Sequence, residues 1–244
     1  MQKQAGNEDQ DEIADCGRQS GDSKIGQRET QTGNYLVKTG FRFQWWWGVA
    51  VLAAGLLLFA SFYFDGAMQS WISAHQSASV KKFMRGVSQF ADWPGHISLG
   101  LVLLVLAYWR RSKKWMRIVA AMILACALAG IGARVVKIAV GRARPSVQTT
   151  EAWSGPNLSA RYNAFPSGHT AASTAFFATL ALASWRLGAA FLVIPVLIGF
   201  SRMYVAAHYL SDVVCAVLIG LLSAYAVAQW LFLEPGDPVA RVRK

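Results

Sequence analysis

The sequence predicts an all-α protein, a polytopic membrane helix bundle with six transmembrane helices and a short extracytoplasmic amphipathic helix. Hydrophobic residues make up 54% of the 244 residues, charged residues make up only 15%, and the mean hydropathy is +0.31. A soluble domain usually carries about 25% charged residues. In addition, long uncharged stretches recur along the chain, and the longest reach the roughly 20 residues that a helix needs to cross a bilayer.

Six apolar stretches follow one another after residue 42. The first and the last are each twenty residues long and uncharged, at Trp45–Phe64 and Val213–Phe232. Between them we expect four further spans, at Trp93–Trp109, Trp115–Ile138, Ser167–Trp185 and Leu187–Ser201. Any one of the shorter stretches could be a buried helix of a soluble core, but six in one chain favour a membrane bundle.

The polar ends of the chain define the expected domain boundaries. Residues 1–42 hold seven acidic and six basic residues and no sustained apolar period, so we expect a disordered polar cytoplasmic tail. Residues 43–235 form the six-span membrane domain. Residues 236–244 form a short basic cytoplasmic tail.

An amphipathic pattern lies between the first two expected spans. Apolar residues recur there at helical spacing, and Lys81, Lys82 and Arg85 lie between them. Two positions fit such a helix: on the outer leaflet of the membrane, or across the top of the bundle. The apolar positions are Val80, Phe83, Met84, Val87 and Phe90.

The formal net charge of +11 indicates both topology and partners. Basic residues cluster before the first span, between spans two and three, between spans four and five, and at the C-terminus. With six spans these clusters share one side, which the positive-inside rule makes cytoplasmic, together with both termini. Because the basic charge belongs to the apolar part of the chain, we expect the bilayer and an anionic substrate as partners, and no nucleic acid.

Three blocks of polar residues interrupt the apolar stretches. The order of the spans places all three at the same membrane face, opposite the main basic clusters. The blocks are Lys137 with Arg144-Pro145, then Pro166–His169, then Ser201-Arg202 with His208 and Asp212.

The cations of these blocks, Lys137, Arg144 and Arg202, lie at or near helix ends. A single cation at such a place is often a side chain that snorkels to the interface. Three at one face, where carboxylates are scarce, indicate an external anion instead. Guanidinium groups bind phosphate or carboxylate through two parallel hydrogen bonds.

The second block has the composition of a helix start. Pro166 suits the first turn of a helix, and Ser167 and Gly168 then lie at its N-terminus. Free N–H groups and the helix dipole favour an anion there, and glycine allows its close approach. A Ser-Gly pair is common, so this block alone is a weak signal.

The histidines supply the candidate chemistry. His208 and Asp212 are spaced i, i+4 and share a helical face, so the carboxylate can accept one ring N–H and leave the other nitrogen free to attack. His169 can act as a general acid. The alternatives are a simple helix-end hydrogen bond and a zinc site; no His-Glu-x-x-His or cysteine pairing supports zinc, and the cations would repel a metal.

Together the three blocks resemble the signature of the type 2 phosphatidic acid phosphatase superfamily. That signature is Lys, six residues, Arg-Pro; then Pro-Ser-Gly-His; then Ser-Arg, five residues, His, three residues, Asp. The chain reproduces its order and spacing at every position. The resemblance covers about residues 95–230 and includes the six-span plan.

The resemblance implies a role for each matched residue. His208 would attack phosphorus to form a phosphohistidine, Asp212 would orient His208, and His169 would protonate the leaving oxygen and then activate water. Arg142 matches no signature position, and we assign it only the steering of anions. The phosphate oxygens would be held by Lys137, Arg144, Ser167, Gly168 and Arg202, with no metal or other cofactor.

The resemblance also implies a setting and a set of substrates. Such proteins act on membrane lipid phosphates at the periplasmic face of bacterial inner membranes. The candidate substrates are lipid A 1-phosphate, which leads, phosphatidylglycerol phosphate, phosphatidic acid and a polyprenyl diphosphate. The loop Ser146–Phe165 is a candidate lid or selectivity element. The alternatives are a lipid phosphotransferase that uses the same phosphohistidine, and a non-catalytic protein that binds or transports lipid phosphates.

Overall fold

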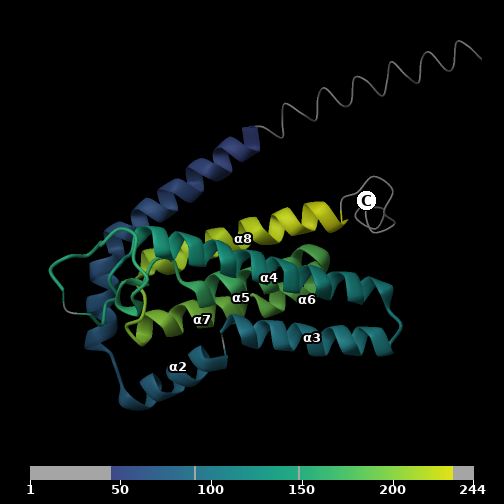
Figure 1. Ribbon diagram of the computed structural model, residues 1–244, viewed down its shortest axis with the longest axis horizontal. Coiled ribbons are helices and arrows are strands. Elements are labelled where there is room, and N and C mark those ends of the chain that lie inside the picture. Colours follow the sequence, from purple (N-terminus) through teal and green to yellow (C-terminus); the bar gives the residue numbers. More distant parts are fainter. Residues whose placement is uncertain (1–44, 91, 148, 233–244) are drawn as a thin grey trace, which may run out of the picture. The chain divides into compact units, whose positions relative to one another are not determined.

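The computed structural model describes residues 45–90, 92–147 and 149–232 (Figure 1). The expected tails 1–42 and 236–244 lie outside these residues. The chain divides into two units, residues 1–55 and 56–244. The described part of the first unit is the beginning of one helix, Trp45–Ala74.

The described residues confirm the all-α class. After the first helix come α2 (Ala78–Phe90), α3 (Trp93–Trp109), α4 (Lys113–Val140), α5 (Gly168–Ala183), α6 (Trp185–Phe191), α7 (Val193–Tyr204) and α8 (Leu210–Phe232). A short 3-10 helix lies at Ala160–Tyr162, in the loop between α4 and α5. That loop also makes two isolated β-bridges, and the described part of the chain contains no strand.

Four helices are long and apolar enough to cross a membrane, which makes this a multi-pass membrane protein. A fifth span results if α2 and α3, which meet at a bend of 56°, are counted together. The expected count of six is therefore not confirmed. The count differs because α3 and α5, with 17 and 16 residues, are shorter than the roughly 20 residues that a helix needs to cross a bilayer. The four long segments are Trp45–Ala74, Lys113–Val140, Trp185–Tyr204 and Leu210–Leu231.

Helix α5 is the central element of the second unit. Every residue from Thr170 to Leu180 is buried, and α4 and α8 pack along it (Figure 1). Small side chains allow this close packing, as is typical of membrane helices. At Gly220 of α8, an added Cβ would lie 2.7 Å from the carbonyl oxygen of Ala171. The tight contact fixes the N-terminal half of α5 against the middle of α8.

Helix α2 is the expected amphipathic helix, and it packs against α7. Met84 joins a buried cluster with Ile72 and Met203, whereas Phe83 is 62% exposed. This packing favours the second of the two expected positions, in which the helix covers part of the bundle.

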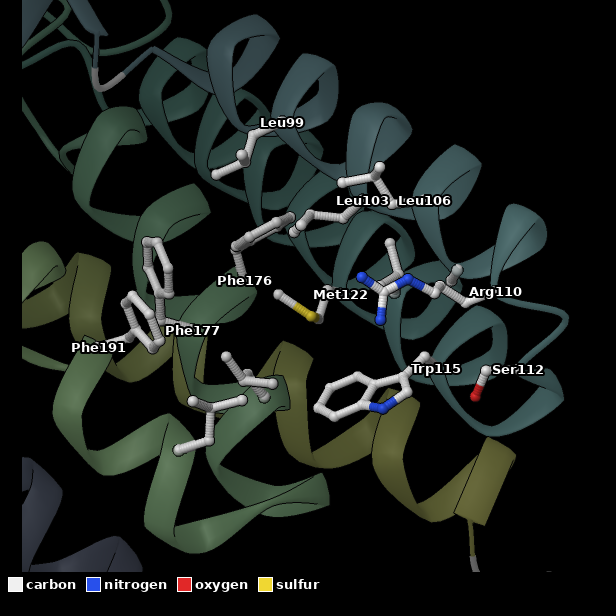
Figure 2. Close-up of a pocket in the computed structure, with 14 residues that line it drawn as sticks. Leu99, Leu103, Leu106, Arg110, Ser112, Trp115, Met122, Phe176, Phe177 and Phe191 are labelled. Atoms are coloured by element: carbon white, nitrogen blue, oxygen red, sulfur yellow. The ribbon is translucent and has the colours of Figure 1, made fainter.

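An apolar cavity of about 560 Å³ lies among α3, α4, α5 and α6. Figure 2 shows Phe176, Phe177 and Met122 on its walls, with Arg110 beside the turn between α3 and α4. None of the residues of the three polar blocks lines it. The candidate site is therefore elsewhere, at the opposite ends of α3 and α4.

Candidate active site

The structure brings the three polar blocks together. The first block lies at the end of α4 and in the loop after it, the second at the start of α5, and the third spans the end of α7 and the start of α8. Ser167 donates its backbone N–H to the carbonyl oxygen of Asp212 at 3.1 Å, which joins the second block to the third. The ammonium of Lys137 lies 3.9 Å from where a Cβ on Gly168 would be, so the first block adjoins the second.

His208 lies in the turn between α7 and α8, with only 1% of its surface exposed. Its Nδ1 is 2.6 Å from the carbonyl oxygen of Ala164 and 3.5 Å from the nearer carboxylate oxygen of Asp212. Because a carbonyl oxygen only accepts hydrogen bonds, Nδ1 carries the proton. The lone pair then lies on Nε2, the atom that a nucleophilic imidazole would use.

Burial also sets the charge of this ring. It lowers the pKa of His208 to about 4, although the hydrogen bond and negative charge of Asp212 oppose the shift. The positive charges of Lys137 and Arg202 lower it further. His208 is therefore neutral at physiological pH, the protonation state that a nucleophile requires.

Asp212 is fully buried, and both of its carboxylate oxygens are hydrogen-bonded. Arg142 donates to Oδ1 at 2.6 Å, and the backbone N–H of Tyr209 donates to Oδ2 at 2.8 Å. The carboxylate is thus held in place beside His208. We expected the Asp212 carboxylate to accept one ring N–H, but the carbonyl oxygen of Ala164 is the nearer acceptor.

Arg142 is the residue whose predicted role was wrong. We expected it only to steer anions, but it is only 8% exposed and donates three hydrogen bonds to buried side chains. Its guanidinium donates to Ser211 Oγ at 2.6 Å, to Asp212 Oδ1 at 2.6 Å and to Asp65 Oδ2 at 2.7 Å. Asp65 belongs to the first helix and also accepts from the backbone N–H of Ser211 at 2.8 Å. A buried charge network therefore holds the start of α8, which the sequence motifs did not indicate.

Aromatic rings enclose the Arg142 guanidinium. It lies 4.2 Å from the ring centre of Tyr209, 4.9 Å from that of Trp153 and 5.3 Å from that of Phe62, distances typical of cation–π contacts. Phe165 packs against both Phe62 and Trp153. Two residues of the expected selectivity loop, Trp153 and Phe165, thus pack around the charge network.

The remaining cations have donors without a protein acceptor. Arg202 donates from Nη1 to Ser88 Oγ of α2, but its Nε is buried and has no hydrogen-bond partner in the described structure. The same holds for Nε of Arg144. Both guanidinium groups are electrostatic neighbours of Lys137. Buried unpaired donors in a cluster of positive charge are the arrangement that an anion would complete.

Ser167 and Gly168 begin α5. The hydroxyl of Ser167 is fully buried and lies 3.0 Å from the hydroxyl of Thr170. The N–H groups of the first turn of a helix have no acceptor within the helix, so the start of α5 adds further donors beside the cations. The start of α5 thus offers backbone donors of the kind that the expected anion cradle requires, while the Ser167 side chain already has a partner.

His169 follows in the first turn of α5, and its partner is a residue that the motifs do not include. Its Nε2 lies 3.6 Å from Oδ1 of Asp92, which also caps α3 by accepting from the backbone N–H of Trp93 at 2.9 Å. His169, Lys137 and Gly168 line one cavity of about 440 Å³. The other residues lining it are Asp92, Trp93, Gly130, Ile131, Arg134 and Val135.

Fold and site together define a multi-pass α-helical membrane protein with a cationic pocket beside a buried His–Asp pair. Residues 118–235 match the family model of the PAP2 superfamily, so this region of the chain is similar to the members of that superfamily. This confirms the resemblance drawn from the three blocks.

Two curated relatives share part of the sequence. The lipid A 1-phosphatase of Rhizobium etli is 38% identical over 126 residues, which are 46% of this chain and 53% of that protein. The lipid A 1-phosphatase of Rhizobium johnstonii is 36% identical over 110 residues, 41% of this chain and 44% of that protein. The matches thus span about half the length of these relatives.

Two solved structures share the fold. A transmembrane PAP2-type phosphatidylglycerolphosphate phosphatase from Bacillus subtilis matches with a TM-score of 0.56 and 18% identity, covering 73% of this chain and 94% of that one. LpxE of Aquifex aeolicus matches with a TM-score of 0.50 and 19% identity, covering 68% of this chain and 95% of that one. At these identities the likeness concerns the fold alone.

Proposed function

We propose that the protein is an integral membrane lipid phosphate phosphatase, which hydrolyses a phosphomonoester or diphosphate head group through a phosphohistidine without a metal. The observation that carries this proposal is the neutral ring of His208, held by its Nδ1–H beside unpaired cationic donors. An anion-binding protein needs the cations but has no use for a buried imidazole with an oriented lone pair. The family match and the two lipid A 1-phosphatase relatives support the same activity.

The proposed reaction has two steps. Nε2 of His208 attacks phosphorus and the bond to the leaving oxygen breaks. The imidazolium form of His169, which the negative charge of the bound phosphate favours, gives its proton to that oxygen. His169 then takes a proton from water, whose oxygen attacks the phosphohistidine and releases inorganic phosphate. Asp212 stabilises the positive charge that develops on the ring. Lys137, Arg144, Arg202 and the first-turn donors at Ser167 and Gly168 hold the phosphoryl oxygens.

We place this reaction at the periplasmic face of a bacterial inner membrane, with both termini in the cytoplasm. The distribution of basic residues in the sequence supports this orientation. Lipid A 1-phosphate is the leading substrate because both curated relatives carry that activity in their names. Phosphatidylglycerol phosphate follows, from the name of the Bacillus subtilis neighbour.

Release of inorganic phosphate from a panel of lipid phosphates tests the proposal. The purified full chain is expected to release phosphate from at least one of the four candidate lipids, and His208→Ala should abolish release while keeping the elution volume and helical content of the parent. Near-parental turnover by that variant would refute the nucleophile. Release that requires an added acceptor alcohol would indicate a phosphotransferase instead.

A further inference from the structure

Arg134 lines the cavity of the candidate site but belongs to none of the three polar blocks. It lies on α4 one turn before Lys137, and the two side chains border the same cavity as His169. Within the described residues its guanidinium has no hydrogen-bond or ion-pair partner. The like charge of Lys137 is an electrostatic neighbour.

The surroundings of Arg134 are those of a side chain facing lipid. Its neighbours Ile131 and Val135 on α4 are 62% and 61% exposed, and Trp93 of α3 completes this side of the cavity. An unpaired guanidinium is costly among apolar side chains within a membrane-spanning helix. The cavity therefore combines an apolar lateral wall with a cation that lacks an acceptor.

The position of Arg134 along α4 defines what could supply that acceptor. With a rise of 1.5 Å per residue, Arg134 lies about 4.5 Å farther from the C-terminal end of α4 than Lys137 does. If the phosphate binds at Lys137 and His169, Arg134 meets the part of the lipid just on the hydrocarbon side of the phosphate. Acylated lipids carry ester or amide carbonyl oxygens at this level, whereas a polyprenyl monophosphate carries only hydrocarbon there.

We propose that Arg134 binds the acyl carbonyl oxygens of the substrate and so selects acylated lipid phosphates over polyprenyl phosphates. The proposal rests on the proposed function, because it takes the bound phosphate at Lys137 and His169 as its reference point. The hydrogen bonds are charge-assisted and form away from bulk water, which makes them strong. The lipid would enter laterally, with its chains along Ile131 and Val135.

Kinetics with matched lipids test this selection. We would compare dioleoyl phosphatidic acid, its di-O-alkyl ether analogue without carbonyls, and a polyprenyl monophosphate, all in mixed micelles with the purified full chain. Arg134→Ala should raise KM for the ester lipid roughly tenfold and change kcat little, since a hydrogen bond from a charged group contributes on that scale. KM for the ether and polyprenyl lipids should change less than about twofold. Arg134→Lys should restore part of the loss.

Arg110→Ala is the matched control, because Arg110 lines the apolar cavity at the opposite end of α3. It should leave all three KM values unchanged. An equal rise for ester and ether lipids upon Arg134→Ala would overturn the proposal, since it would indicate a general charge effect. An unchanged KM for the ester lipid would show that Arg134 only snorkels to the interface. A rise in KM for the polyprenyl monophosphate as large as that for the ester lipid would also overturn the proposal.

A binding measurement separates this proposal from the proposed function. In the His208→Ala background, native mass spectrometry would compare retention of the ester and ether lipids with and without Arg134→Ala. Selective loss of the ester lipid supports the carbonyl contact even if the wild-type chain releases no phosphate. If Arg134→Ala changes the retention of the ester lipid no more than that of the ether lipid, the contact is refuted, whether or not the chain is a phosphatase.

Discussion

At the scale of single residues, the state of His208 depends on a backbone contact. The carbonyl oxygen of Ala164 holds Nδ1–H at 2.6 Å, and Asp212 adds a negative charge at 3.5 Å. Ala164 lies three residues before Ser167, so the loop that carries the second block also orients the candidate nucleophile. This hydrogen bond joins the second block to the third, in addition to the one from the backbone N–H of Ser167 to the carbonyl oxygen of Asp212.

This contact predicts how His208 titrates. Nitrogen-15 NMR of the substrate-free protein should show a neutral ring protonated on Nδ1, with a titration midpoint near pH 4. Because burial lowers the pKa, the free lone pair on Nε2 persists through the range where an ordinary histidine gains a proton, and it is lost only as the pH falls through about 4. His208→Gln assigns the resonance. A midpoint near 6.5, or a ring protonated on Nε2, would contradict the structure.

The sequence could predict the residues of the three blocks but not most of their partners. The blocks have characteristic spacing within short segments, and their convergence follows from the order of the spans. Asp65 and Arg142 are 77 positions apart, and no spacing links them. Ala164 contributes a carbonyl oxygen, which every residue type possesses, so its identity carries no signal.

At the scale of elements, the first helix shows how such a contact alters a boundary. We expected the span to end at Phe64, before the charge of Asp65, but the helix continues to Ala74. Arg142 neutralises Asp65, so the charge does not end the helix. By contrast α3 has the predicted bounds, Trp93–Trp109, because Asp92 and Arg110 flank it in the sequence itself.

The same charge network yields a prediction for the first helix. Asp65→Asn removes one charge of a buried ion pair and should lower both stability and kcat, since Arg142 also holds Asp212. Breaking such a pair costs about 3–5 kcal/mol, which we expect as a clear fall in the apparent unfolding temperature in detergent. Glu151→Gln, which alters an exposed carboxylate in the loop between α4 and α5, is the control and should leave both quantities unchanged. Parental stability and kcat in Asp65→Asn would show that the network does not hold the site.

At the scale of the whole molecule, the described residues contain few acidic side chains, and most of these lie at the candidate site. The described residues contain four carboxylates, at Asp65, Asp92, Glu151 and Asp212. Three of them already face a cation or a histidine of the site. The positive charges of Lys137, Arg144 and Arg202 remain for the substrate, and in the proposed reaction they stabilise the phosphoryl oxygens.

This distribution predicts activity without a divalent ion. Phosphate release should be unchanged in excess EDTA, because fixed cations supply the charge that Mg²⁺ supplies in other phosphoryl transfers. The check is a turnover assay before and after chelation, with readdition of Mg²⁺, Mn²⁺ or Zn²⁺. Loss of activity upon chelation that any of these ions restores would contradict the proposed stabilisation by side chains.

The central claim is that His208 forms a covalent bond to phosphorus. The most direct measurement is rapid quenching with a lipid labelled in its terminal phosphate, followed by proteolysis and mass spectrometry under alkaline conditions that preserve phosphohistidine. We predict that the phosphoryl group is found on His208 of the parent chain during turnover, that it forms more slowly in His169→Ala, which lacks the acid of the first step and the base of the second, and that it is absent from His208→Ala. Turnover by the parent chain without any phosphoryl-enzyme, or label on another residue, would contradict the account.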